Sequence, residues 1–321
     1  ATKGSRTRAG YFKKSLGHFQ PSNLTEIYAA IEVLSSEFSV VKLCRILGVS
    51  RSAYYSYVNG TSYVLKEEKQ AISQAIKKVF ERHKKRYGWR RIQSELADEG
   101  WLVGRHQIRS RMEEQNLKAI QPKSYVPKTT QSHPHLRRSP NLLLLAENLP
   151  TKPNEVIVGD ITYLPNEEKG EDKWLYLATW LDLYSHRIVG WHIDRHMEES
   201  LVIEATKQVI DFRQPEKNFL VHSDGGGQYG AIKFRELLKL HGFRQSMTRP
   251  DNHYDNAHAE SLFSRFKAEL LDGGIFRGLD DAYYRTFEYI EGYYNTIRRH
   301  SSIGYLSPAN YEQEFWKSNP R

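Results

Sequence analysis

The order of strand-like and helix-like segments after residue 155 constrains the fold of this chain more than any other feature. Residues 155–164, 174–183 and 187–193 are β-rich and separated by short polar turns, which predicts three antiparallel strands. Helices and short strands then alternate, and the expected segments are a helix over 198–212, a strand over 218–222, a helix over 232–241, a strand over 243–246 and helices over 256–270 and 281–295. This order predicts an α/β domain in the second half of the chain.

Three carboxylates occupy special places in this domain, which matches the ribonuclease-H-like α/β plan. Asp160 lies within the first strand, Asp224 follows the strand over 218–222, and Glu260 lies in the helix over 256–270. Each ends or interrupts an apolar run, where an unpaired carboxylate is costly without a cation. Three glycines follow Asp224, and they allow backbone and DNA to approach closely. The trio therefore predicts metal-assisted phosphodiester chemistry.

The expected chemistry needs an attacking oxygen, a stabilised leaving oxygen and neutralised phosphate charge. Two Mg²⁺ ions roughly 3.5–4 Å apart supply all three. Mg²⁺ prefers oxygen ligands, and clustered carboxylates repel one another until they capture cations. Asp160 is expected to bridge both ions, while Asp224 and Glu260 each bind one. Water would attack in cleavage and a DNA 3′-hydroxyl in joining, so no covalent enzyme nucleophile is required.

Other ionisable residues near the trio have alternative interpretations. Asp182 competes as a metal ligand, but its place at a strand end favours a turn-capping role. Lys267 lies seven residues, about two turns, after Glu260 and so projects from the same helix face. Two roles for Lys267 stay open: contact with the scissile DNA end, and a surface salt bridge. The histidines without zinc-like spacing are interpreted as structural or DNA-contacting: His222, His253 and His258.

Charge divides the chain into two different halves. Residues 1–150 hold 26 Lys and Arg against 12 Asp and Glu, whereas residues 151–321 hold 21 against 26. A basic front half suggests a polyanion-binding region joined to a different kind of domain. The simpler alternative is a basic surface that only keeps the protein soluble.

Length and composition set further limits. A chain of 321 residues is expected to form two or three domains, and 39% apolar residues are ample for packed cores. The single cysteine, Cys44, excludes an internal disulfide and a thiolate metal cluster. The longest obvious apolar run, 142–146, is too short for a membrane span, and the basic N-terminus resembles no secretory signal. We therefore expect a soluble, cytoplasmic protein without a membrane partner.

The first DNA-binding candidate lies in residues 24–58. The segment 39–47 has helical spacing, Gly48 to Ser50 form a turn, and residues 51–57 begin another helix. This pattern predicts a helix-turn-helix, whose second helix enters the major groove. The residues expected to face DNA are Arg51, Ser52, Tyr54 and Tyr55, although one or both tyrosines equally fit a small core.

A second helical pair follows a long helix predicted over 66–85. Gly100 ends one helix and Gly104 precedes another over 105–116. A solvated basic helix is the alternative to DNA contact at this pair. The arginines expected to contact phosphates or bases are Arg90, Arg91, Arg105, Arg109 and Arg111.

These segments predict a multidomain chain, with all-α helix-turn-helix modules followed by an α/β ribonuclease-H-like integrase core. Residues 121–153 contain six prolines among polar and basic residues, as expected of an extended linker, with 142–145 as a docking segment. The expected divisions are a basic arm or linker over 1–23, helical modules over 24–62 and 63–120, the linker over 121–153 and the catalytic core with its helical extension over 154–321.

At these motifs the sequence resembles bacterial insertion-sequence transposases, specifically the second-frame catalytic product called OrfB, which shares the DDE core of retroviral integrases. Thirty-five residues separate Asp224 from Glu260, an interval similar to that of the family. The similarity covers about residues 24 to 315. Its segments are Leu-Gly-Val-Ser-Arg-Ser-Ala-Tyr-Tyr (47–55), Tyr-Gly-Trp-Arg-Arg-Ile (87–92), Asp-Ile-Thr-Tyr (160–163), Leu-Asp-Leu-Tyr-Ser-His-Arg-Ile-Val-Gly-Trp (181–191), His-Ser-Asp-Gly-Gly-Gly-Gln-Tyr (222–229), Asp-Asn-Ala-His-Ala-Glu-Ser (255–261), Tyr-Asn-Thr-Ile-Arg-Arg-His (294–300), Gly304-Tyr305 and Pro308.

The resemblance implies Asp160, Asp224 and Glu260 as catalytic metal ligands, with Lys267 as the associated basic residue. It implies Mg²⁺, replaceable by Mn²⁺, and cleavage of element ends in double-stranded DNA. One 3′ end then attacks near the opposite end of the same strand, and the resulting circle is integrated into target DNA. Because two ends must meet, a dimer or larger homo-oligomer is expected, associated with the bacterial nucleoid when bound.

Two departures from the family pattern bear on these expectations. His186 and Gly230 stand where Arg and Thr or Ser are usual, but neither position is catalytic. The family enzyme usually carries an upstream helix-turn-helix and leucine zipper from the first frame, OrfA, and no apolar heptad run precedes residue 24. Residues 1–23 are interpreted as the remnant of that junction, with OrfA as an expected partner or fusion.

Two other functions stay open at this stage. One is a domesticated DNA-binding regulator with a silent core, against which the intact carboxylate trio argues. The other is a ribonuclease-H-like nuclease without joining activity, which the front helical modules disfavour. Nicked and joined DNA products would separate all three.

Overall fold

The computed structural model describes residues 24–59, 67–122, 138–168, 173–249, 257–271 and 274–320, and for 67–68, 146 and 257–263 only the backbone. The chain divides into two compact units, residues 1–74 and 75–321, and the division falls within one helix. Within the described residues, no helix combines the length and apolar character needed to cross a membrane.

The first unit contains a three-helix core made by α2 (Leu24–Leu34), α3 (Val40–Leu47) and α4 (Arg51–Val58). Gly48 ends α3 with φ 72°, a left-handed conformation that glycine adopts without steric cost. The interior residues are Tyr28, Ile31, Leu43, Cys44 and Tyr54. The expected helical pair with a glycine turn is therefore present.

The second unit begins within α5 (Glu67–Arg82), which forms a helical module with α6 (Trp89–Asp98) and α7 (Arg105–Glu114). The first helix ends three residues earlier than expected, and left-handed Lys84 and Lys85 follow it. Ile92 and Leu96 of α6 and Ile108 of α7 are almost fully buried between these helices. Here too the glycines before and after short helices correctly predicted a helical pair.

The remainder of this unit forms a five-stranded mixed sheet in the order β3-β2-β1-β4-β5. β1 pairs antiparallel with β2 and parallel with β4, while β2–β3 is antiparallel and β4–β5 parallel. The expected α/β plan is confirmed, with boundaries that differ by one or two residues. The strands are β1 (Val156–Pro165), β2 (Trp174–Asp182), β3 (Ile188–Asp194), β4 (Leu220–Ser223) and β5 (Arg244–Met247).

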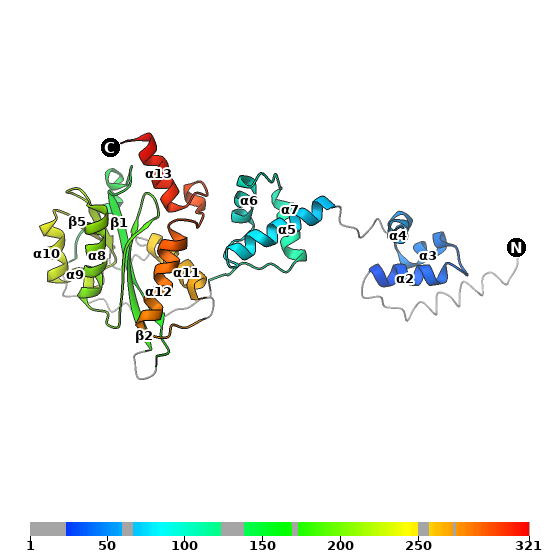
Figure 1. The fold of residues 1–321 in the computed structure, drawn as a ribbon, viewed down its shortest axis with the longest axis horizontal. Helices are drawn as coiled ribbons and strands as arrows, with labels where there is room; N and C mark the ends of the chain where they lie inside the picture. Colours follow the sequence, from blue (N-terminus) through cyan, green and yellow to red (C-terminus); the bar gives the residue numbers. More distant parts are fainter. Residues whose placement is uncertain are drawn as a thin grey trace. The chain divides into compact units, whose positions relative to one another are not determined.

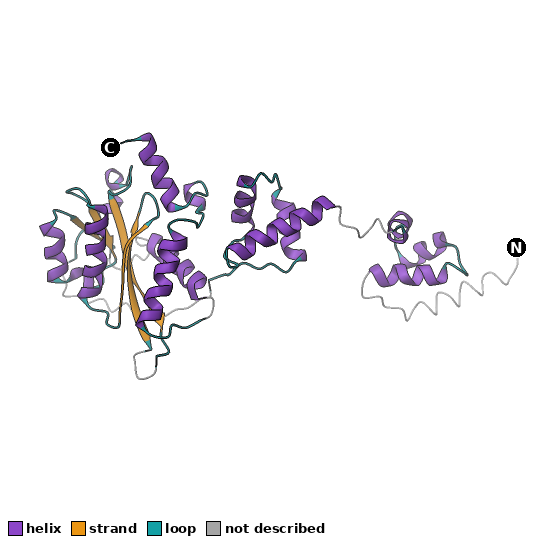
Figure 2. Cartoon of the chain, viewed as in Figure 1, coloured by secondary structure: helices purple, strands orange, loops and turns teal. Residues whose placement is uncertain are grey.

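Helices cover both faces of this sheet (Figures 1 and 2). On one face lie α8 (Glu199–Arg213), α9 (Gly227–Gly230) and α10 (Ile232–Leu240), and on the other α11 (Ala257–Leu271) and α12 (Leu279–Tyr289). Alternation along the strands explains both layers: Ile157 packs toward α8, and the next residue, Val158, packs toward α11. Because successive strand residues point to opposite faces, the sheet has a hydrophobic core on each side.

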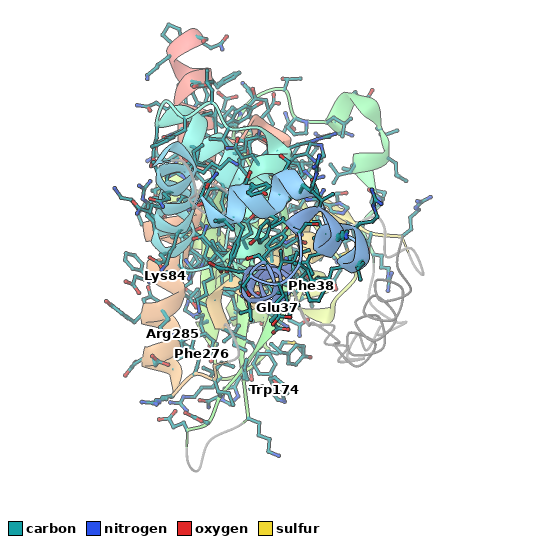
Figure 3. The ribbon with its side chains drawn as sticks, turned by 90° about the vertical axis from the view of Figure 1, so that its right-hand side faces the viewer. Glu37, Phe38, Lys84, Trp174, Phe276 and Arg285 are labelled. Atoms are coloured by element: carbon teal, nitrogen blue, oxygen red, sulfur yellow. The ribbon has the colours of Figure 1, made fainter. Side chains whose placement is uncertain are left out.

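The C-terminal part continues beyond α12 as a π-helical turn (Ile290–Tyr294), a 3₁₀ turn (Ser301–Ile303) and α13 (Pro308–Ser318). The helix expected over 281–295 is thus an α-helix followed by a wider turn. At the other end of this layer, the Arg285 guanidinium lies 4.7 Å from the centroid of the Phe276 ring (Figure 3), a cation–π contact that anchors α12.

The second part of the proline-rich segment lies against the sheet edge. Ser139 Oγ donates to Gln245 Oε1 at 2.8 Å, and the Met247 N–H donates to the Pro140 carbonyl at 3.3 Å. The Leu142 N–H donates to Ser246 Oγ at 2.9 Å. Residues 138–148, including the 3₁₀ turns Leu142–Leu144 and Ala146–Asn148, therefore dock along β5.

Candidate active site

Asp160 and Asp224 are brought together by strand pairing. β1 and β4 run parallel, and their register ends with Gly159 opposite Ser223, so Asp160 and Asp224 directly follow a paired position of the two strands. Neighbouring strands lie about 4.8 Å apart and paired residues project to the same face. Two carboxylates separated by 63 residues in the sequence thus share one spot at the carboxyl end of β4.

Backbone N–H groups hold both carboxylates. The Ile161 N–H donates to Asp160 Oδ1 at 2.8 Å, and the Gly226 N–H donates to Asp224 Oδ1 at 2.9 Å. Burial raises the pKa of Asp224, although the Gly226 hydrogen bond and the charge of Arg138 oppose this shift. The net rise means that desolvation of the carboxyl group outweighs these two contributions.

The third carboxylate belongs to a helix that packs against the strand of the first. α11 lies against β1, and its backbone includes Glu260. The side chain of Glu260 lies outside the described residues. Among the side chains that the structure describes, no three His, Cys, Asp or Glu residues form a metal-binding group.

Lys267 of α11 lies close enough to Asp160 for the two charges to interact. Burial lowers the pKa of Lys267, and the negative charge of Asp160 acts in the opposite direction. The side chain is half-buried rather than on the outer surface. A partly desolvated ammonium beside the aspartates suits contact with a phosphate better than an exposed salt bridge does.

Tyr229 is a site residue that the sequence did not single out. Its side chain is 1% exposed, and among the described residues its hydroxyl has no hydrogen-bond partner. Burial raises the pKa of Tyr229 well above its ordinary value, and the negative charges of Asp160 and Asp224 add to that rise. A buried hydroxyl without a partner, near enough to two carboxylates to feel their charge, fits a site that holds a hydrated cation, because metal-bound water would accept or donate the missing bond.

Arg138 is a second site residue that no sequence pattern indicated. A Cβ added at Gly225 would lie 2.7 Å from Arg138 Cζ, so the guanidinium packs directly on this glycine. The group that approaches the glycines after Asp224 in this structure is therefore an arginine from the docked segment. Its distance of 86 residues from Asp224 explains why spacing did not reveal it.

The remaining polar residues near the sheet have structural roles. Asp182 is 1% exposed; its Oδ1 accepts from the Tyr184 and Ser185 N–H groups, and its Oδ2 accepts from the Asn154 N–H. The turn-capping interpretation of Asp182 is confirmed. His222 is buried and its Nδ1 lies 2.8 Å from Ser246 Oγ, while His253 and the His258 side chain lie outside the described residues.

The residues expected to face DNA divide into exposed and internal groups. Tyr54 is 4% exposed and packs in the helical core, so it does not face DNA, whereas Tyr55 is 50% exposed. Arg91 points inward and donates to the Arg299 carbonyl at 2.9 Å, and Arg111 pairs with Glu114 at 2.5 Å with only 13% of its side chain exposed. The exposed members of the expected set are Arg51, Ser52, Tyr55, Arg90, Arg105 and Arg109.

Comparisons with known proteins agree with this architecture. Residues 150–253 and 241–308 match two family models, each described as Integrase core domain, and residues 67–125 match an HTH-like domain. A solved HTLV-2 integrase catalytic core domain in complex with magnesium (trimeric form) aligns with 50% of this chain and 98% of that chain, at 15% identity and a TM-score of 0.38.

Two curated relatives align over almost their whole length. The insertion element IS600 uncharacterized 31 kDa protein of Shigella sonnei is 36% identical over 273 residues, covering 85% of this chain and 98% of the relative. Transposase InsF for insertion sequence IS3A of Escherichia coli (strain K12) is 34% identical over 289 residues, covering 89% and 98%. By this identity and coverage, the chain belongs to the insertion-sequence transposase family that includes InsF of IS3.

Proposed function

We propose that this transposase cuts the ends of its element and joins the 3′-hydroxyls to target DNA, with Asp160, Asp224 and Glu260 as ligands of two Mg²⁺ ions. The position of Asp160 and Asp224 directly after the paired residues Gly159 and Ser223 of β1 and β4 carries the proposal. Adjacent carboxylates in a partly buried site repel one another unless a cation lies between them. The packing of α11 on β1 supports Glu260 as the third ligand.

The protein groups around the carboxylates have distinct roles in this proposal. Bound divalent cations supply Lewis-acid stabilisation of the phosphate and an activated water or 3′-hydroxyl. Ile161 and Gly226 N–H groups orient the aspartates. Lys267 contacts the scissile phosphate, and the Tyr229 hydroxyl orders water at the inner side of the site.

DNA contact is proposed for the exposed residues of both helical modules. These side chains carry positive charge or hydroxyl groups on short helices that follow glycine turns, as expected for contact with double-stranded DNA. The proposed contacts are Arg51, Ser52, Tyr55, Arg90, Arg105 and Arg109. Tyr54, Arg91 and Arg111 are omitted because their side chains pack inside the protein.

The wider pathway is proposed from the family to which the chain belongs. Joining two ends requires a dimer or larger complex that holds the terminal inverted repeats together, and the product of end joining is a circle that integrates into target DNA. An OrfA partner or fusion would contribute to end selection. Mn²⁺ is expected to replace Mg²⁺, and the complex would act on the nucleoid in the cytoplasm.

The direct test uses element-end DNA with Mg²⁺, Mn²⁺ or EDTA, and nicked and joined strands are resolved on denaturing gels. Asp224→Asn is expected to abolish both products while DNA binding in a gel-shift assay is retained. Asp211→Asn, at an exposed carboxylate of α8, is the matched control and should keep both products. Cleavage by Asp224→Asn would remove this residue from the site.

The same assay distinguishes the alternatives. Binding of end DNA without any product from the unaltered protein would favour a regulator with a silent core. Cleavage without joined strands would favour a nuclease. Products in EDTA would contradict the metal-dependent mechanism.

A further inference from the structure

A hollow of about 500 Å³ lies between the helical module and the loop after Ile303. It is distinct from the carboxylate site, and α6, α7 and the C-terminal loop all contribute to its wall. Residues that line it include Trp89, Arg90, Gln93, Ser94, Arg105 and Tyr305. Two arginines, two aromatic rings and two uncharged polar groups thus surround one opening.

The lining of the hollow is positively charged, because the described residues that line it include two arginines and no Asp or Glu. Arg90 and Arg105 are exposed at the rim. Glu95 and Asp98, on the same helix as Arg90, accept hydrogen bonds from Arg299 at 2.5 and 2.6 Å. The rim therefore presents cationic groups whose attraction for phosphate is not cancelled by neighbouring carboxylates.

The aromatic groups are held in defined positions. The Arg90 guanidinium lies 4.6 Å from the centroid of the Trp89 ring, which forms a stacked cationic platform. Tyr305 has φ 63°, a left-handed conformation that is uncommon for a non-glycine residue. The hydrogen bond from its N–H to the His300 carbonyl at 2.8 Å maintains this conformation. Such an unfavourable backbone state at a pocket wall is typical of functional positions.

Arg299 joins the two walls of the hollow. Its Nη1 donates to Ser94 Oγ at 3.2 Å on α6 and to the Tyr305 carbonyl at 3.3 Å on the loop. Its backbone N–H donates to the Tyr87 hydroxyl at 2.9 Å. Hydrogen bonds of Arg299 therefore hold α6 and the loop with Tyr305 together at the hollow.

We propose that this hollow binds an unpaired nucleotide of a DNA strand. The base stacks against the aromatic wall formed by Trp89 and Tyr305, and Arg90 and Arg105 bind the flanking phosphates. Stacking platforms next to cationic groups are the usual means of holding single-stranded nucleic acid. The proposal rests on the proposed DNA-processing function and adds a site at which a melted strand is held outside the carboxylate centre.

The test measures the affinity of the full chain for fluorescein-labelled dT12 and for a labelled 30-base-pair duplex by fluorescence anisotropy. Tyr305→Ala and Trp89→Ala are each expected to weaken dT12 binding about five- to 150-fold, the range for loss of one base–aromatic stack. Duplex binding should change much less. Tyr284→Ala and Arg277→Ala alter exposed residues outside the hollow and serve as aromatic and charge controls.

Unchanged dT12 affinity in both aromatic variants would overturn the proposal, as would an equal loss in the Tyr284→Ala control. A second measurement needs no substitution: 5-iodouracil placed in dT12 should form photo-crosslinks to peptides that contain Trp89 or Tyr305. Crosslinks confined to other peptides would also overturn it. Asp224→Asn should leave dT12 binding intact, so a failed cleavage assay with normal dT12 binding counts against the proposed function alone.

Discussion

Replacing Arg298 by methionine would remove one half of a buried ion pair that ties α11 to the C-terminal segment. Arg298 is 2% and Glu269 3% exposed, and the guanidinium donates to both carboxylate oxygens, at 2.7 Å from Nε and 2.6 Å from Nη2. The Tyr289 hydroxyl donates to the same carboxylate at 2.9 Å. The substitution leaves Glu269 buried without its principal partner.

The magnitude follows from this burial. Loss of one partner of a buried pair costs about 3–5 kcal/mol. At about 2–4 °C per kcal/mol for a unit of this size, the thermal unfolding midpoint should fall by about 6–20 °C. The double variant Glu269→Leu/Arg298→Met removes both charges and should recover most of the loss, because no charge is left buried and unpaired.

Circular dichroism of the full chain during heating measures the midpoints. Burial by itself raises the pKa of Glu269. The charge and hydrogen bonds of Arg298 lower this pKa by more than burial raises it, so the net pKa lies below the ordinary value of 4.5. The stabilisation is therefore present above about pH 4.5 and is lost as the pH falls through the lowered pKa. A double variant less stable than Arg298→Met would refute the reasoning.

Two further predictions concern acid stability and packing. The His83 imidazole, whose Nε2 lies 3.5 Å from Glu95 Oε1, is the main cause that lowers the pKa of Glu95 to about 2, so the stabilising contribution of Glu95 should be complete above pH 4.5 and vanish toward pH 2. The free energies of unfolding of the parent and of Glu95→Gln, measured along an acid titration, should therefore converge at low pH. A difference in stability that stays constant with pH would contradict this. In Gly190→Ala, the new Cβ would lie 2.4 Å from the Ala205 carbonyl oxygen, which should cost about 1–3 kcal/mol in urea unfolding. Gly292→Ala is the control: its Cβ would meet no atom within 4 Å, so it should not show the loss of stability expected from steric overlap in Gly190→Ala.

Local patterns predicted most of the secondary structure because they depend on neighbouring residues. The strand starting at Val156 and the helix ending near Leu271 differ from expectation by only one residue at those ends. The turn-capping role of Asp182 was also accessible, since a carboxylate at a strand end finds its N–H partners within the next few residues.

The orientation of side chains around a helix was harder to predict. Tyr54 and Tyr55 are adjacent and chemically identical, yet one is buried and the other half exposed. On α6, Arg90 lies at an exposed rim while Arg91 donates to the Arg299 carbonyl. Successive helical residues differ by about 100° in direction, and only the packing partner decides which direction is inside.

The sequence by itself determined the α/β plan, the helical modules, the family and the three carboxylates expected to bind metal, because these depend on short motifs and local periodicity. Only the tertiary structure decided that Arg138 reaches Gly225, that the buried Tyr229 lies near enough to Asp160 and Asp224 to feel their charge, and that Arg299 joins the walls of the basic aromatic hollow. These contacts unite residues far apart along the chain. Their formation depends on strand register and helix packing, which no local pattern specifies.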